Sequence, residues 1–310
     1  MSTVNFFLYT TTTQDAYQFI QKVNTLIISK QNQKGVKIKM IQRTKQFNNV
    51  KDFLESPLSS HTYLELNLSQ NEISQQDLIN LSFALSNCVD LISLNLNLDK
   101  NKMRQQEISV LCQTLFIKFT NLTTLSINLQ LNQIGSQGAQ DLANSLIQCS
   151  SSLQNLTLNL QLNYIGVQGV LSLGNAIEKC SKLINITLGL QENQIGEEGA
   201  KNLGCSLEKC SYLQNLVLKL YFNNIRDTGA KDLCFYIAKI TNLSALKLNL
   251  YFNMITDEGM HSLISCLQQS INLSILSLDL IGNLIRETSE IKFKSKIMKM
   301  KRLVKKETLF

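Results

Sequence analysis

The stretch Leu183–Cys210 decides the fold: Leu-Ile-Asn-Ile-Thr-Leu-Gly-Leu-Gln-Glu-Asn-Gln-Ile, then Gly-Glu-Glu-Gly-Ala-Lys-Asn-Leu-Gly-Cys-Ser-Leu-Glu-Lys-Cys. From Ile186 to Leu190 an apolar side chain stands at every second position, which is typical of a strand with one face in a core. Further on, the apolar residues are spaced three and four apart, as at Leu203 and Leu207, which is typical of a helix. The stretch therefore predicts a strand, a turn and a short helix.

The same skeleton recurs along the chain, marked in each copy by an asparagine after the strand. These landmark asparagines, 30 or 31 residues apart, are Asn71, Asn101, Asn132, Asn163, Asn193, Asn223, Asn253 and Asn283. Eight copies fill residues 61–300. A fixed period of this size predicts a solenoid in which each unit covers the apolar face of the next. We expect eight parallel strands side by side, with helices along the other side.

The pattern Leu-x-x-Leu-x-Leu…Asn-x-Ile-x-x-x-Gly…Leu…Leu…Cys resembles the leucine-rich repeat, specifically its ribonuclease-inhibitor-like class. The resemblance implies a right-handed α/β solenoid, or horseshoe, with a parallel sheet on the concave side and helices on the convex side. It also implies a ladder of landmark asparagines, since an inward Asn can donate to and accept from backbone groups in the turn. Leu183 and Asn193 are ten positions apart, two more than is usual in the family. We interpret this as a strand lengthened by two residues; a bulge is the alternative.

The two ends of the chain differ from its body. Residues 1–60 are expected to form an N-terminal cap, with a degenerate repeat that places Val36 and Ile38 at strand positions. Residues 61–300 carry the repeats, and residues 301–310 are expected to form a basic C-terminal tail. The net charge of +7 resides in the ends, because residues 1–60 and 286–310 carry 17 Lys/Arg against six acids.

A basic patch surrounds the last predicted helix. It comprises Lys292, Lys294, Lys296, Lys299, Lys301 and Arg302. One interpretation is a solvated capping helix; the other is a binding patch for RNA, acidic lipid or an acidic protein tail. Phe293 is the one aromatic residue among these lysines, and it takes an apolar position of the predicted helix, so stacking on bases has no support.

The eight cysteines predict buried structural thiols. Four of them, Cys88, Cys149, Cys180 and Cys210, recur seventeen residues after a landmark asparagine. No Cys-x-x-Cys pair occurs, so zinc is unsupported, and no metal or other cofactor is expected. We therefore expect a reducing, cytoplasmic location. No apolar run reaches the length of a membrane span, and the start of the chain lacks the basic region of a secretory leader.

The concave side chains change character along the chain. Repeats 1–5 present small and amide side chains, whereas repeats 6–8 present larger ones. The predicted partner-binding residues are Val217, Lys219, Tyr221, Lys247, Tyr251 and Ile281. Tyrosine at rigid, exposed positions is typical of binding hot spots. We interpret Phe222 and Phe252, next to the landmark asparagines, as core filling at the turn.

The sequence predicts a non-enzymatic intracellular scaffold that binds another protein through the concave face, and no small-molecule substrate. The two histidines, His61 and His261, lie far apart, and neither a phosphate-binding Gly-Lys-Ser/Thr nor a Gly-x-Ser-x-Gly motif occurs. One alternative follows from a resemblance to Ran GTPase-activating proteins, which use a loop arginine. Three arginines share one loop position here: Arg104, Arg226 and Arg286. That family's acidic tail is replaced by a basic end. Another alternative is a structural component of a cytoskeletal or ciliary assembly.

Overall fold

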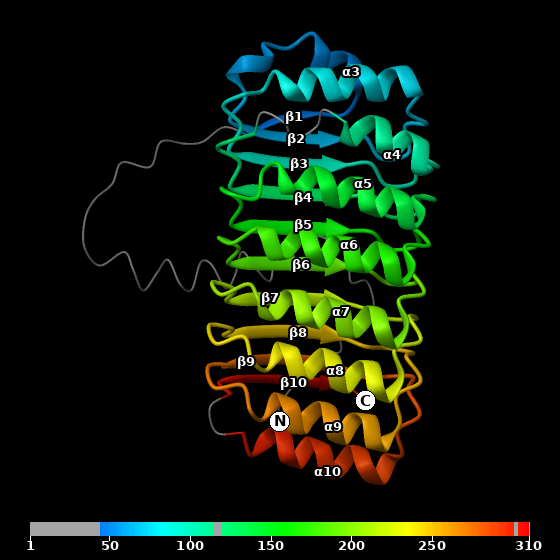
Figure 1. Cartoon of the computed structure of the whole chain (residues 1–310), viewed down its shortest axis with the longest axis vertical. Coiled ribbons are helices and arrows are strands. Elements are labelled where there is room, and N and C mark those ends of the chain that lie inside the picture. Colours follow the sequence, from blue (N-terminus) through cyan, green and yellow to red (C-terminus); the bar gives the residue numbers. More distant parts are fainter. Residues whose placement is uncertain (1–43, 114–118, 301–302, 310) are drawn as a thin grey trace, which may run out of the picture. The chain divides into compact units, whose positions relative to one another are not determined.

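The computed structural model describes residues 44–113, 119–300 and 303–309. These residues form one parallel sheet of ten strands in sequence order (Figure 1). The strands are β1 (Lys45–Phe47), β2 (Tyr63–Asn67), β3 (Ser93–Asn97), β4 (Thr124–Asn128), β5 (Asn155–Asn159), β6 (Asn185–Gly189), β7 (Asn215–Lys219), β8 (Ala245–Asn249), β9 (Ile275–Asp279) and β10 (Lys305–Leu309). The eight predicted strands are present, with one more at each edge of the sheet.

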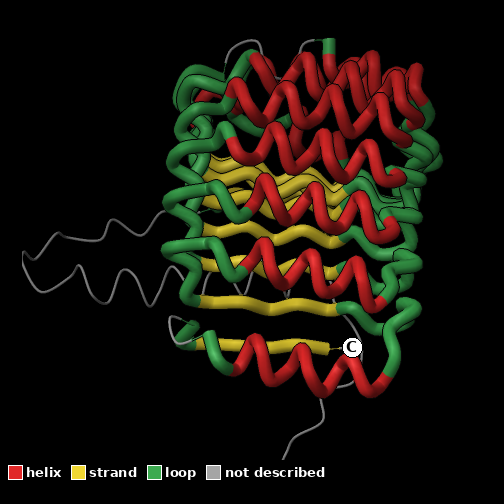
Figure 2. Tube along the Cα trace, turned by 60° about the horizontal axis from the view of Figure 1, so that its bottom comes forward, coloured by secondary structure: helices red, strands yellow, loops and turns green. Residues whose placement is uncertain are grey.

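Helices follow the strands and lie together along one side of the sheet (Figure 2). They are α3 (Gln75–Ser86), α4 (Gln105–Cys112), α5 (Gly135–Ile147), α6 (Gly166–Lys179), α7 (Gly196–Glu208), α8 (Arg226–Ile237), α9 (Asp257–Leu267) and α10 (Glu287–Met298). Before β2 stand α2 (Val50–Leu54) and a 3-10 turn (Leu58–Ser60). The fold is therefore the α/β solenoid that the repeat period predicts. The sheet face opposite the helices is called the concave face below.

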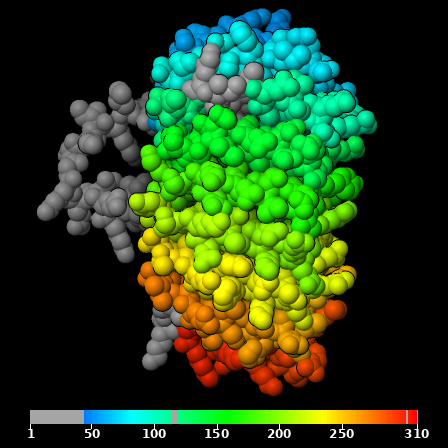
Figure 3. All heavy atoms as spheres, in the orientation of Figure 1, coloured from blue at the N-terminus to red at the C-terminus, as the bar shows by residue number. Residues whose placement is uncertain are grey.

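The core runs without a break between sheet and helices. In β6 and β7, Ile186 pairs with Leu216 and Leu188 with Leu218, and all four side chains are buried. Leu203, on the helix α7 of the same repeat as β6, is fully buried as well. Fully burying one such side chain stabilises the fold by roughly 1.5–3 kcal/mol. Because each repeat supplies a layer of this kind, the repeats follow one another as bands along the surface (Figure 3).

The additional length of each repeat extends the sheet and does not form a bulge. The strand β6 ends at Gly189, yet the backbone N–H of Leu190 donates to the carbonyl of Lys219 at 2.9 Å. Two residues later Glu192 donates to the carbonyl of Tyr221 at 3.0 Å. The parallel register is therefore kept through these positions, and the chain turns only afterwards.

Glycine in the helices allows neighbouring helices to approach closely. A Cβ atom at Gly259 would lie 2.8 Å from the Cα of Asp227 and 2.0 Å from its Oδ1. At Gly229 it would lie 2.8 Å from the Cα of Glu197. Backbone atoms cannot yield to such contacts, so glycine at this repeat position sets the spacing of the helical layer.

The N-terminal edge of the sheet is covered by β1, which pairs with β2 in parallel. Phe53 of α2 is fully buried and, with Phe47, surrounds the buried ring of His61. The expected strand positions Val36 and Ile38 lie outside the described residues. The strand that pairs with β2 is formed by residues 45–47. It is closer in sequence to β2 than the repeat period of 30 residues predicts.

The C-terminal edge is formed by β10, although its residues were expected to belong to a tail. Leu303 is buried and stands 30 residues after Leu273, so the repeat spacing continues into a further strand. Lys306 takes the register position opposite Leu276, and its Nζ donates to the carbonyl of Met298 at 2.8 Å. Lysine at a core-facing position of an edge strand opposes further pairing.

Candidate protein-binding surface

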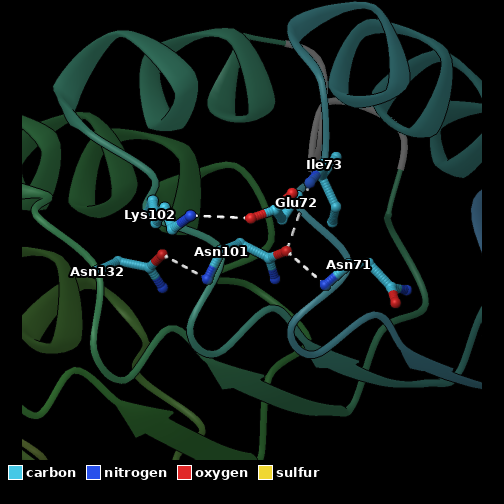
Figure 4. Close-up of polar contacts among 6 residues, drawn as sticks. All are labelled: Asn71, Glu72, Ile73, Asn101, Lys102 and Asn132. Carbon is cyan, nitrogen blue, oxygen red and sulfur yellow. Dashed lines mark hydrogen bonds and ion pairs between the residues drawn. The ribbon is translucent and has the colours of Figure 1, made fainter.

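The landmark asparagines are structural and form a ladder across the repeats (Figure 4). The Oδ1 of Asn101 accepts from the backbone N–H groups of Asn71 at 3.0 Å and Ile73 at 3.5 Å. The Oδ1 of Asn132 in turn accepts from the N–H of Asn101 at 3.1 Å. These amides satisfy turn groups that would otherwise be buried unpaired, as the family resemblance implies.

A second ladder runs along the concave face at the first residue of the strands β4 to β7. Asn155 donates to the Oγ1 of Thr124 at 3.0 Å, Asn185 to Asn155 at 2.5 Å, and Asn215 to Asn185 at 2.5 Å. The ladder stops there because Ala245 takes the next position, and the buried Oδ1 of Asn215 has no hydrogen-bond partner. Sequence reasoning missed this column, although Asn recurs at its positions 155, 185 and 215.

Amides in the early repeats also bond to one another. Asn97 donates to Asn67 at 3.0 Å, and Asn159 to Asn128 at 2.9 Å. Groups already paired in this way gain little from a partner protein, because a new hydrogen bond would replace an existing one. This part of the concave face is therefore poorly suited to be the main contact.

The structure places the six predicted partner-binding residues on or beside β7, β8 and β9, but it does not expose them equally. Tyr221, Lys247, Tyr251 and Ile281 are half-buried. Val217 and Lys219 are buried, with only 1% and 7% of their surface exposed. The expectation that these two are exposed is wrong, because strand alternation fixes the face to which a side chain points and not what packs over it.

Tyr221 is held in place by polar contacts. Its hydroxyl accepts a hydrogen bond from the Nε2 of Gln161 at 2.6 Å. Gln161 belongs to repeat 4 and Tyr221 to repeat 6, so this bond spans the repeat between them. Burial raises the pKa of Tyr221, and the negative charge of Glu192 adds to this effect. The tyrosine therefore stays neutral and reaches across the position of Gln191, which is itself buried.

Four aromatic rings meet at the ends of β7 and β8. Phe222 and Phe252 stack with centroids 4.8 Å apart and an interplanar angle of 11°. Tyr251 meets Phe252 edge-on at 4.4 Å, and Tyr221 lies 6.2 Å from Tyr251. Such pairs contribute about 0.5–1.5 kcal/mol beyond their buried area. The four rings form one ordered cluster.

Phe222 and Phe252 do not fill the core, contrary to the sequence interpretation. They are 47% and 42% exposed. Both have a left-handed backbone, with φ of +53° and +50°, which carries the side chain outward before the landmark asparagine turns inward. The sequence contained a sign of this, because polar residues take the same repeat position at Gln70, Lys100 and Glu192.

The basic patch lies along α10 and the residue that follows it. Lys292, Lys294 and Lys299 are exposed. Lys296 is half-buried, with its Nζ 3.2 Å from the Nε2 of His261 and 5.4 Å from the ring centre of Phe293. The other two residues of the patch, 301 and 302, lie outside the described residues.

Two of the three loop arginines are paired with carboxylates of the preceding repeat. Arg286 forms an ion pair with Asp257, and its backbone N–H lowers the pKa of that carboxyl. The Nη1 of Arg226 lies 4.0 Å from Glu197. Arg104 is the N-cap residue before α4, and its backbone N–H donates to the Oε2 of Glu107 at 2.9 Å.

Cysteine chemistry has no support in the described residues. All eight thiols are free; six are buried, while Cys205 and Cys266 are half-buried. Burial raises the pKa of Cys88 to about 12, and the pKa values of Cys112, Cys149, Cys180 and Cys210 are raised to the same value. A thiol in that state is neither a nucleophile nor a ready metal ligand. No group of three or more His, Cys, Asp or Glu within the described ranges could hold a metal ion.

Comparison with known protein families identifies the repeat in two places. A family model described as Leucine Rich repeat matches residues 120–143 and 212–234, which include β4 and β7. The match does not distinguish the ribonuclease-inhibitor-like class. No curated protein matches the chain. Among the described helices, none is long and apolar enough to span a membrane.

Proposed function

Because this chain is a leucine-rich repeat protein, we propose that it is a non-enzymatic scaffold that binds another protein through the concave face, chiefly at repeats 6–8. Leucine-rich repeat domains generally bind other proteins. The observation that supports this region is the change in side chains at repeat 6. Hydrogen-bonded amides there give way to the half-buried Tyr221, Lys247, Tyr251 and Ile281.

Energetics favour this end of the face. Burying an aromatic side chain gains free energy without breaking an existing hydrogen bond, and aromatic residues dominate binding hot spots. The Nζ of Lys247 supplies a charge beside Asp279, whose pKa is raised by burial despite this lysine. Contact with the rings would supply most of the binding free energy, and contact with Lys247 and Asp279 would fix the orientation of the partner.

We further propose an intracellular, reducing location, which the eight free thiols support. Helices of 11–14 residues in the internal repeats α5–α9 support the ribonuclease-inhibitor-like class. The GTPase-activator alternative gains no support from Arg226 and Arg286, because both are paired with carboxylates. Assembly on a cytoskeletal or ciliary structure is one form that the scaffold role could take, and a fluorescent tag on the chain would reveal it.

Proximity labelling in cells tests the proposal. The variant Tyr221→Ala/Tyr251→Ala should lose labelled proteins that the wild type recovers. Tyr212→Ala is the matched control, because Tyr212 is 62% exposed and precedes β7, at the other end of the strand. If the double variant labels the same set as the wild type, the contact surface has been misplaced; if neither protein labels any partner, the scaffold role itself fails.

A further inference from the structure

The loops that follow the strands form a rim between the concave face and the helices (Figure 1). We define the rim as seven residues per repeat, from the residue before the landmark asparagine to the fifth after it. In repeats 6–8 this rim exposes large apolar side chains. Phe222 is 47% exposed, Phe252 42%, Met254 51% and Leu284 65%. These four residues are called the apolar ridge.

The ridge is preorganised. Phe252 stacks on Phe222, and its ring occupies the space beside Gly282, where a Cβ atom would lie 2.3 Å from the ring. Tyr251 supports the same ring edge-on from the concave side. A partner would therefore cover side chains that are already ordered, and the entropy cost of binding would be small.

The rim also changes charge along the chain. In repeats 1–4, residues 70–76, 100–106, 131–137 and 162–168 carry one carboxylate against three basic side chains. In repeats 5–8, residues 192–198, 222–228, 252–258 and 282–288 carry seven carboxylates against two arginines. The rim thus goes from a net charge of +2 to −5 within a chain whose total is +7.

Three of these carboxylates are available to a partner. Glu198, Glu258 and Glu287 are exposed and form no ion pair with another described residue. Acids at helix starts also stabilise the helix dipole. That effect alone does not explain the pattern, because α5 and α6 begin without a carboxylate in the first turn.

We propose that the rim of repeats 5–8 binds a polypeptide segment of another protein that carries apolar side chains and an excess of lysine or arginine. The apolar side chains of the segment cover the ridge. Its cations lie against Glu198, Glu258 and Glu287, where charge attraction orients the segment. This inference rests on the proposed function and specifies the chemistry of the partner.

A displayed library of random peptides, about 12 residues long, selected on the full chain, is the probe. Enriched peptides should carry a net positive charge and at least one aromatic or branched aliphatic residue. When resynthesised, they should bind Phe222→Ser/Met254→Ser at least tenfold more weakly than the wild type, since exposed anchors of this kind carry most of the binding energy. Tyr164→Ser is the matched control, because Tyr164 is 62% exposed at the repeat position of Met254 and should not matter.

Charge is tested separately. Glu198→Gln/Glu258→Gln/Glu287→Gln should weaken binding severalfold at low salt, and the loss should largely disappear at about 0.5 M salt because screening removes the attraction. Thermal unfolding of each variant should match the wild type, which shows that the fold is intact. Neutral or acidic enriched peptides, no enrichment, or unchanged binding by the ridge variant would each overturn the proposal.

A second copy of the chain is the competing occupant, and sedimentation velocity identifies it. Self-association that the ridge variant abolishes would overturn the choice of a foreign segment. Failure of the rim proposal can be distinguished from failure of the scaffold proposal. If Tyr221→Ala/Tyr251→Ala changes the proteins labelled in cells while the peptide selection fails, the rim proposal falls alone.

Discussion

The most direct test of the fold is the substitution Asn193→Ala in the middle of the landmark ladder. Asn193 is fully buried. Its Oδ1 accepts from the backbone N–H of Asn163 at 3.0 Å and of Ile165 at 3.2 Å. Its Nδ2 donates to the carbonyl of Leu160 at 2.8 Å and of Gln191 at 3.0 Å. One side chain therefore makes four hydrogen bonds, three of which connect its repeat to the preceding one.

The loss of unfolding free energy in Asn193→Ala follows from the backbone groups that are left without a hydrogen-bond partner. The carbonyl of Gln191 still accepts from the N–H of Leu162, so it is not orphaned. The N–H groups of Asn163 and Ile165 and the carbonyl of Leu160 lose the partner that Asn193 provides. At about 1–3 kcal/mol for each unpaired buried group, the loss is about 3–9 kcal/mol. Water entering the vacated space offsets part of it, and we expect about 4 kcal/mol, a large share of a typical total of about 5–15 kcal/mol.

Urea unfolding followed by circular dichroism measures this loss, and hydrogen exchange locates it. Exchange should increase in repeats 4 and 5 first, because stability in a solenoid is a sum of local and nearest-neighbour contributions. Asn71→Ala is the matched control: Asn71 is exposed, and among the described residues its side chain makes one hydrogen bond, from its Nδ2 to the carbonyl of Asn48 at 3.1 Å. The control should cost less than about 1 kcal/mol. Equal losses at the two positions, or a loss below about 1 kcal/mol at Asn193, would refute the reasoning.

Three further predictions concern packing, pH and thiol access. Gly259→Ala should destabilise the fold by about 1–3 kcal/mol, seen as a lower thermal midpoint, because the added methyl group meets the backbone of Asp227; an unchanged midpoint would contradict the packing. The pKa of His61 is lowered by burial and then by a nearby positive charge. The folded state therefore disfavours the proton, so stability is full above about pH 6.5 and falls as pH falls through the folded pKa. Urea midpoints at several pH values should show this fall, and His61→Gln should remove it. Alkylation followed by mass spectrometry should modify Cys205 and Cys266 in the native protein and the other six cysteines only after unfolding; early modification of a buried thiol would contradict the core.

The repeat period was sufficient to predict the sheet, its parallel order and the core. The spacing of leucines fixes which residues meet across the strands, and the register Leu188 with Leu218 follows directly from it. The same spacing extends to Leu303, so the final strand was also within reach of the sequence. That strand was not predicted because Lys306 stands where the other repeats have a core leucine, and a charged residue at this position suggests a solvent-exposed tail.

The candidate surface was less predictable because it depends on backbone conformation and on what packs over a side chain. Phe222 reads as a core residue by composition, and only its positive φ places it outside. Val217 and Lys219 have the alternation of exposed concave residues, yet both are buried. Residue type and spacing encode well the face to which a strand side chain points, whereas the burial of a side chain on that face leaves no periodic trace in the sequence.

The left-handed turn explains how one repeat can serve both the fold and a partner. The residue before the landmark asparagine has a positive φ in all eight repeats, from +50° at Phe252 to +72° at Gly282. For residues other than glycine this conformation costs roughly 1–2 kcal/mol, which the hydrogen bonds of the following asparagine offset. The turn places Phe222 on the rim and Asn223, fully buried, in the ladder. Of two adjacent residues, one is therefore exposed on the rim and the other makes the hydrogen bonds that hold the repeats together. The rim residue can differ from repeat to repeat while the asparagine ladder stays the same.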